Sequence, residues 1–249
     1  MNLQELTRRQ YLEAMDITVW QSRQRREEPA ADAAPAALME QAVAVERLPK
    51  VEESRSDYGN SVDNTINMDW PALEAAVRAC QKCELHKTRT QTVFGVGDRQ
   101  AQWMFVGEAP GADEDRQGEP FVGKAGQLLN AMLQALNLKR EQVYIANVLK
   151  CRPPNNRDPQ PQEVGQCEPY LARQIALVNP KIIVALGRHA VHNLLKTDLA
   201  LGKLRGQKLS YNGIPLLATY HPAYLLRNPV DKRKAWEDLC LARKIVEQS

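Results

Sequence analysis

The sequence predicts an α/β fold of three layers, in which helices cover both faces of a central sheet of four parallel strands. Three observations support this prediction. Apolar segments of strand length alternate with helical segments from residue 102 onward, which is the order of βαβ units. Polar, glycine-containing or proline-containing loops follow three of these strands, where parallel sheets bind ligands. Residues 1–67 are instead rich in Ala, Pro and charge, which is typical of a flexible leader.

Each element has its own local signal. Asp69 is a suitable N-cap and Pro71 a suitable first-turn residue, so a helix is expected over residues 70–80. The segment QWMFVG predicts a buried strand, and KAGQLLNAMLQAL predicts a helix with one apolar side. The later elements are strands at 143–149, 181–187 and 214–220, helices at 161–178 and 188–196, and a terminal helix opened by Asp231.

Length and composition exclude several classes of protein. The chain has 249 residues, of which 43% are hydrophobic and 25% charged, as in ordinary globular proteins. No run approaches the ~18 apolar residues of a membrane span, and the first residues lack the apolar stretch of a secretory signal. We therefore expect a cytoplasmic monomer that has no membrane partner.

Charge is distributed unevenly along the chain, whose net charge is +3. Residues 1–69 contain 13 acidic and 8 basic residues, whereas residues 70–249 contain 17 acidic and 25 basic residues. A basic body suits a polyanionic partner, although a solvated basic surface explains the charge equally well. The expected organisation is an acidic leader at 1–67 followed by a folded domain at 68–249.

The leader contains one segment with an amphipathic pattern, RRQYLEAMDITVW at residues 8–20. A short helix here would either fold back on the domain or dock on a groove of another protein. The segment is similar to the N-terminal peptide of the psi subunit of the replicative clamp loader. That similarity implies a replication-protein partner for the leader.

Four of the five cysteines are candidate metal ligands. Cys80 and Cys83 form a CxxC turn, and Cys151 and Cys167 are too far apart to form the second CxxC pair of a zinc ribbon. An iron–sulfur cluster accepts wide spacing, because its four thiolates bind four separate corners. Buried cysteines without a metal are the alternative. Cys240 lies in the predicted terminal helix and is expected to pack in the core.

The loops after the strands carry the polar residues that chemistry would use. GEAPGADED contains Glu108 and Glu114, NVLKCRPP begins with Asn147, and HPAYLL begins with His221 at the end of a strand. His86 follows the CxxC turn, and His189 and His192 lie in a predicted helix without a cysteine or carboxylate partner at metal-binding spacing. All three are expected to be structural or surface residues. His221 alone has a catalytic setting.

Taken in order, these motifs resemble the family 4 uracil-DNA glycosylases. The resemblance is carried by GEAPGADED, PFVGKAGQLL, NVLKCRPP, the four cysteines and HPAYLL, and it covers roughly residues 70–245. It implies the uracil-DNA glycosylase fold, a [4Fe–4S] cluster on the four cysteines, and hydrolytic excision of uracil from DNA. Family 5 enzymes carry a different first motif. DNA-crosslinking relatives carry a basic insert ending in histidine, which LRGQ at 204–207 lacks.

The resemblance also assigns roles in base recognition. After the base is flipped out of the stack, Phe121 would stack on it and Asn147 would pair with its O4 and N3–H. Gly107 and Ala109 would line the pocket. Leu225 would fill the space that the base leaves in the DNA.

Catalytic roles follow in the same way. His221 would donate a hydrogen bond to O2 as negative charge develops there. Ala109 stands where many related enzymes have the Asp or Asn that steers water, so Glu108 and Glu114 are the candidate groups for that step. The family also places Glu114 where it would help to exclude the methyl group of thymine.

Three other functions are weighed against this one. A non-catalytic replisome subunit could retain the fold, and an iron–sulfur redox sensor could retain the cysteines. Neither role needs Phe121, Asn147 and His221, so this set of residues disfavours both. Nucleotide hydrolysis is disfavoured because GEPFVGKA at 118–125 has Ala125 where a P-loop has Ser or Thr.

Overall fold

The computed structural model describes residues 64–248, so the leader segment at 8–20 and its expected partner lie outside the described residues. The first described element lies just before the expected domain boundary at residue 68. Asn64–Asn67 form a 3-10 helix, η1, whose Thr65 is buried. Met68, the residue after η1, is bound by Arg173, whose Nε donates a hydrogen bond of 2.6 Å to the Met68 carbonyl.

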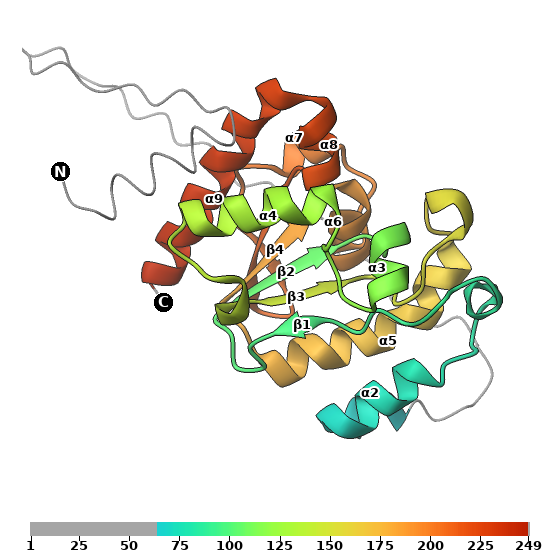
Figure 1. The fold of residues 1–249 in the computed structure, drawn as a ribbon. Coiled ribbons are helices and arrows are strands. Elements are labelled where there is room, and N and C mark those ends of the chain that lie inside the picture. Colours follow the sequence, from blue (N-terminus) through green and yellow to red (C-terminus); the bar gives the residue numbers. More distant parts are fainter. Residues whose placement is uncertain (1–63, 249) are drawn as a thin grey trace, which may run out of the picture. The chain divides into compact units, whose positions relative to one another are not determined.

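A sheet of six strands forms the middle layer of residues 64–248 (Figure 1). The strands are β1 (Val96–Gly97), β2 (Trp103–Gly107), β3 (Tyr144–Asn147), β4 (Ile182–Leu186), β5 (Leu209–Tyr211) and β6 (Ile214–Thr219). Their spatial order is β1-β3-β2-β4-β6-β5. The four inner strands are parallel, which confirms the predicted central sheet. The short edge strands β1 and β5 pair antiparallel and were not predicted.

The five predicted helices occur in the predicted order, with ends that differ by a few residues. The helices are α2 (Trp70–Arg78), α3 (Ala112–Gln117), α4 (Lys124–Ala135), α5 (Pro161–Val178), α6 (Arg188–Leu195), α7 (Leu201–Leu204), α8 (Pro222–Arg227) and α9 (Lys232–Glu247). Of these, α3, α7 and α8 were not predicted. Short 3-10 helices lie at η2 (Glu84–Lys87), η3 (Arg140–Gln142), η4 (Pro154–Asn156) and η5 (Pro229–Asp231). None of the helices within 64–248 is long and apolar enough to cross a membrane.

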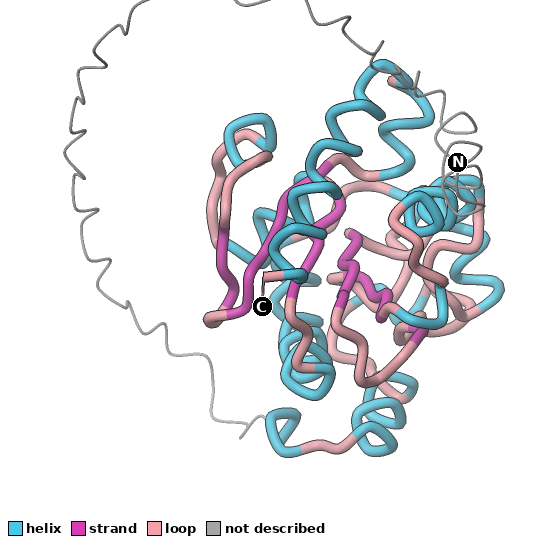
Figure 2. Tube along the Cα trace, turned by 90° about the vertical axis from the view of Figure 1, so that its left-hand side faces the viewer, coloured by secondary structure: helices cyan, strands magenta, loops and turns pink. Residues whose placement is uncertain are grey.

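Alternation along the strands builds two hydrophobic layers, one on each face of the sheet. Phe105, Val184 and Leu217 pack against α4, α8 and α9, whereas Met104 and Ile183 pack against α5, α6 and α7. Figure 2 shows helices on both sides of the magenta strands. The three-layer prediction is therefore confirmed.

Local signals explain where the helices begin. The Asp69 carboxylate accepts a hydrogen bond of 3.0 Å from the Ala72 N–H, as expected of the N-cap of α2. Helix α3 occupies the acidic segment after β2, which was expected to be a loop. Gly111 is its N-cap, and three acidic residues lie in its first turn, where the helix dipole favours negative charge.

Candidate active site and cysteine-lined cavity

The carboxyl ends of the four parallel strands bring the expected site residues to one edge of the sheet. Gly107 at the end of β2 pairs in register with Asn147 at the end of β3. Leu186 and Thr219 pair in the same way at the ends of β4 and β6, and Gly187 and His221 follow them closely. These residues are distant in sequence, and parallel pairing is what gathers them.

Asn147 is buried at this edge, with 2% of its surface exposed. Its Oδ1 is buried and has no hydrogen-bond partner, one of two such side-chain atoms among the described residues. A Cβ atom at Gly107 would lie 2.3 Å from this oxygen and 2.6 Å from Cζ of Phe121. Gly107 is therefore required for the Asn147 amide and the Phe121 ring to meet.

Phe121 lies beside both Gly107 and His221. Its ring is 5.5 Å from the His221 ring between centroids, with an angle of 30° between the planes. The residue has a left-handed backbone, with φ of 55°, which is rare for a bulky side chain. The structure thus brings together Phe121, Asn147 and His221, the three residues to which the family resemblance gave roles in base recognition and catalysis.

His221 is the N-cap of α8, and its orientation is fixed by its own helix. Its Nδ1 accepts a hydrogen bond of 3.1 Å from the Ala223 N–H. The neutral ring therefore carries its proton on Nε2, which is the nitrogen free to donate. Burial lowers the pKa of His221 to about 4, assisted by the positive charge of Arg227. The ring is neutral at physiological pH.

Glu108 follows β2 and is half-buried. Burial raises its pKa above the ordinary value, as does the charge of Asp158, while His189 opposes the shift. The Nε2 atom of His189 lies 3.9 Å from Glu108 Oε2 and 3.3 Å from Asp158 Oδ2. The expectation that His189 lacks a carboxylate partner was wrong, because these partners come from loops that are distant in sequence.

Glu114 has a different setting from the one expected. Its carboxylate accepts hydrogen bonds of 3.0 to 3.1 Å from the N–H groups of Gly111, Val122 and Gly123. These bonds tie α3 to the loop that carries Phe121. A carboxylate that is already bonded to three backbone donors is poorly placed to activate water, so Glu114 is a support of the pocket wall.

Leu225 is 1% exposed and packs in the core with residues of α4 and α9. A side chain that enters DNA must reach the surface, so the expected wedge role does not fit its position. The next residue, Leu226, is 43% exposed, and Val230 in η5 is 88% exposed. Ala109, which stands in place of an acidic or amide residue, packs near the half-buried Cys83 and the cluster of Leu149, Cys151 and Cys167.

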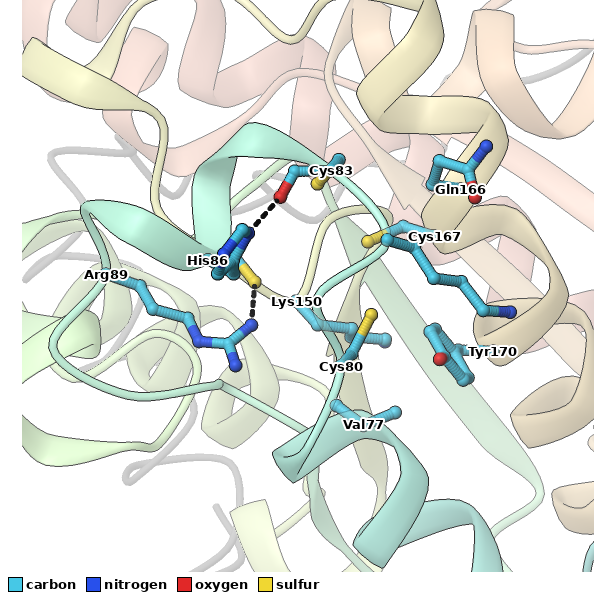
Figure 3. A pocket seen from close by; sticks show the side chains of 11 residues that line it. Val77, Cys80, Cys83, His86, Arg89, Lys150, Gln166, Cys167 and Tyr170 are labelled. Atoms are coloured by element: carbon cyan, nitrogen blue, oxygen red, sulfur yellow. Dashed lines mark hydrogen bonds between the residues drawn. The ribbon is translucent and has the colours of Figure 1, made fainter.

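Four cysteines border one cavity, as the spacing suggested. Cys80 and Cys83 lie between α2 and η2, Cys151 follows β3, and Cys167 lies in α5. All four are free of disulfide bonds. Figure 3 shows the labelled Cys80, Cys83 and Cys167 around a common space. Burial raises the pKa of the Cys167 thiol to about 12.

Positively charged side chains surround this cavity. Arg89 donates a hydrogen bond of 3.0 Å to the Cys151 sulfur, and Lys82 and Lys150 also line the wall. His86 lines it too, with its Nδ1 2.7 Å from the Cys83 carbonyl oxygen. Four thiols within a positively charged wall form a donor set that suits an anionic metal–thiolate centre.

Comparison with known proteins agrees with this geometry. The uracil DNA glycosylase superfamily model matches residues 94–240. The type-4 uracil-DNA glycosylase of Archaeoglobus fulgidus is 49% identical over 161 residues, which cover 61% of this chain and 81% of that protein. The type-4 enzyme of Saccharolobus solfataricus is 47% identical, over 73% of this chain and 86% of its own. The type-4 enzyme of Sulfurisphaera tokodaii is 45% identical, over 70% of this chain and 83% of its own.

The α/β sheet, the residues gathered at its strand ends and these matches define a member of the uracil DNA glycosylase superfamily. Within it, the chain belongs to the type-4 uracil-DNA glycosylases, as the sequence motifs suggested.

Proposed function

We propose that this protein removes uracil from DNA by hydrolysis of the N-glycosidic bond, which leaves an abasic site. The observation that carries the proposal is the unpartnered, buried Oδ1 of Asn147. A buried acceptor without a partner is costly unless a ligand supplies the donor. Uracil offers N3–H to Oδ1, while its O4 accepts from the amide nitrogen of the same side chain.

The reaction places negative charge on the departing uracil, shared with its O2 atom. His221 is neutral and has Nε2–H available, so it can donate to O2 without first losing or gaining a proton. Such a donor is worth ~2.7–4 kcal/mol of transition-state stabilisation in other enzymes. The Phe121 ring, next to His221, supplies an apolar face on which the flipped base can stack.

Glu108 is the carboxylate that we propose orients the attacking water or stabilises the sugar cation. Glu114 is occupied by three backbone donors, and Ala109 has no polar group. The side chain of Glu108 is 30% exposed, and His189 and Asp158 form a charged cluster beside it. The carboxylate can therefore reach water while its neighbours restrict its orientation.

The surface at α8 and η5 provides a contact for DNA. We assign the wedge role to Leu226 in place of Leu225, because Leu226 is the exposed leucine of α8. Arg227, Arg233 and Lys234 are exposed close by in sequence, and such side chains bind phosphates. An exposed apolar side chain flanked by basic residues suits insertion between bases held by backbone contacts.

The cysteine-lined cavity is proposed to hold a [4Fe–4S] cluster on Cys80, Cys83, Cys151 and Cys167. When bound, the cluster would act as a structural cross-link with no part in the bond cleavage. The cysteines come from three separate segments, namely the α2–η2 connection, the end of β3 and α5. Joining these segments would fix the start of the domain and the loop after Asn147.

The central experiment measures strand cleavage by alkali after incubation of the iron-loaded protein with a DNA oligonucleotide that contains one uracil. Oligonucleotides with thymine or cytosine at the same position are the matched substrates. We expect cleavage with uracil alone, and loss of that cleavage in Asn147→Ala protein with normal iron content. Equal activity of Asn147→Ala would refute the role of this side chain, and an inactive iron-loaded wild-type protein would refute the proposed function.

A replication protein is the proposed partner of residues 1–67, on the similarity of residues 8–20 to the psi peptide. Deleting residues 1–60 should leave uracil excision intact, because none of the pocket motifs in the sequence lies there. In pull-down experiments, the full chain should retain a replication protein, and the truncated chain should lose it. Loss of excision on truncation would instead place the leader in the active site.

A further inference from the structure

Lys150 is a buried cation between the base pocket and the cysteine-lined cavity. The residue is 1% exposed. Its Nζ donates hydrogen bonds of 2.8 Å to the Asn147 carbonyl and 2.6 Å to Gln174 Oε1. The same side chain lines the cavity of the four cysteines (Figure 3). One side chain thus contacts the backbone of the base-reading residue and the wall of the metal site.

The positive charge of Lys150 lacks an ordinary counter-charge. Within residues 64–248, Lys150 forms no ion pair with a carboxylate, and Cys151 and Cys167 line the same cavity as its side chain. Both of its hydrogen bonds go to neutral acceptors. A buried ammonium without an opposite charge is unfavourable, and its removal is the expected outcome unless something anionic lies beside it. Four thiolates holding an iron–sulfur cluster would provide that negative charge.

The second partner of Lys150 is itself held in place. Gln174 in α5 is fully buried, and its Nε2 donates to the Phe94 carbonyl at 2.9 Å and to the Tyr144 hydroxyl at 3.2 Å. The amide can then present only Oε1 to Lys150. Lys150 is consequently fixed at both hydrogen bonds, and movement of its ammonium would move the Asn147 carbonyl.

We propose that Lys150 is the buried counter-ion of the iron–sulfur cluster and, through the Asn147 carbonyl, a positioning residue for the base pocket. The inference rests on the proposed function, since it requires the cluster and the role of Asn147. It adds a physical link between the two sites. Cluster binding holds the Lys150 charge in place, and Lys150 then holds the strand end from which Asn147 reads the base.

Two substitutions separate the charge from the hydrogen bond. Lys150→Met removes both at nearly constant size, whereas Lys150→Gln removes the charge and retains an amide donor. Lys82→Met is the matched control, because Lys82 lines the same cavity but is exposed to solvent. Measurements on the full-length iron-loaded proteins are the cluster reduction potential, the rate of iron loss to a chelator, and the Kd for free uracil.

We expect both Lys150 variants to disfavour the reduced cluster about tenfold, or about 59 mV for a one-electron couple. Both should also lose iron faster, and Lys82→Met should shift far less because water screens its charge. The Kd for uracil should rise most in Lys150→Met and less in Lys150→Gln. If Lys150→Met does not fold, Lys150→Gln and Gln174→Met are compared instead. Gln174→Met should weaken uracil binding and leave the cluster reduction potential almost unchanged.

Unchanged potential and iron retention in Lys150→Gln would overturn the counter-ion role. Unchanged uracil affinity in both Lys150→Met and Gln174→Met would overturn the positioning role. Wild-type protein that binds no iron would refute the inference as a whole. Protein that binds iron but does not excise uracil would refute the proposed function. The cluster reduction potentials would still decide the counter-ion role in that case.

Discussion

The Nδ1 atom of His221 accepts a hydrogen bond from the N–H of Ala223, two residues further along the chain. The helix that follows the histidine therefore selects the tautomer with a proton on Nε2. Burial keeps this tautomer neutral by lowering the pKa to about 4. In the proposed reaction, this neutral donor would face the O2 atom of the departing base as that base gains negative charge.

This pKa has a consequence for the pH dependence of excision. The ring becomes cationic, and Nδ1 stops accepting from the Ala223 N–H, only near pH 4, so the single-turnover rate should show no change due to His221 as the pH passes through 6.5. As the pH is lowered, the rate is expected to fall when Glu108 takes up a proton. This occurs at a higher pH than for an ordinary glutamate, because burial raises the pKa of Glu108, and Glu108→Gln should abolish the fall. Rates measured between pH 4 and 8 decide this. A rate that halves near pH 6.5 in both proteins would contradict a neutral, buried His221.

The same shift affects stability, with a definite sign. Between pH 6.5 and about 4 the unfolded chain binds a proton at His221 that the folded chain does not. The contribution of His221 to the unfolding free energy is thus fully present above pH 6.5 and decreases as the pH falls toward 4. Denaturation of the wild type and of His221→Gln at several pH values measures the difference.

Replacement of Asn147 by Asp tests the base-reading role. The carboxylate of Asn147→Asp cannot donate to O4 of uracil, so most uracil excision should be lost. If the buried Asp takes up a proton, it can pair with N3 and N4 of cytosine, and slight cytosine excision is then expected at lower pH. Kinetics on uracil and cytosine oligonucleotides, with iron content as control, measure both effects. Full uracil activity in an iron-loaded variant would remove Asn147 from the pocket.

The two adjacent leucines of α8 should behave differently. Leu226→Ala should slow excision from double-stranded DNA about tenfold more than from single-stranded DNA, because unstacking is costly only in the duplex. Leu225→Ala should instead lower the unfolding free energy by ~2–5 kcal/mol, as expected of a buried leucine. Rates on both substrates and denaturant unfolding distinguish the variants. A stable Leu225→Ala protein with a selective defect on duplex DNA would return the wedge role to Leu225.

The metal content distinguishes the cysteines. Purified wild-type protein should contain about four irons per chain, the stoichiometry of a [4Fe–4S] centre on four thiolates. Cys167→Ala should lose iron, whereas Cys240→Ala should retain it, because Cys240 lies in α9 and does not line the cavity. Iron and sulfide analysis of anaerobic samples provides the measurement. Stoichiometric zinc without sulfide would overturn the assignment.

The sheet and the pocket were predictable because both follow from local patterns. Parallel strands bring their carboxyl ends together, so Gly107, Asn147 and His221 had to meet once the strands were recognised. The edge strands β1 and β5 were missed because two or three residues are too few to show a strand period.

The remaining differences depend on tertiary contacts. His189 gains its carboxylate neighbours from residues 108 and 158, and no spacing rule joins such distant positions. Leu225 and Leu226 are alike in sequence, and only the packing of α8 on the core decides which of them is exposed. Lysine is almost never fully buried, so nothing in the sequence separates Lys150 from surface lysines.

Phe121 is held in a left-handed backbone conformation, and this has a consequence for protein engineering. Such a conformation costs on the order of 1–3 kcal/mol for a residue with a bulky side chain. Glycine would adopt it without strain, so Phe121→Gly would relieve the backbone while it removes the aromatic wall beside His221. The Phe121 ring is only 5% exposed, however, and truncation of a buried phenylalanine costs ~3–5 kcal/mol, which exceeds that strain. Selection for thermal tolerance is therefore expected to retain a large apolar side chain at this position.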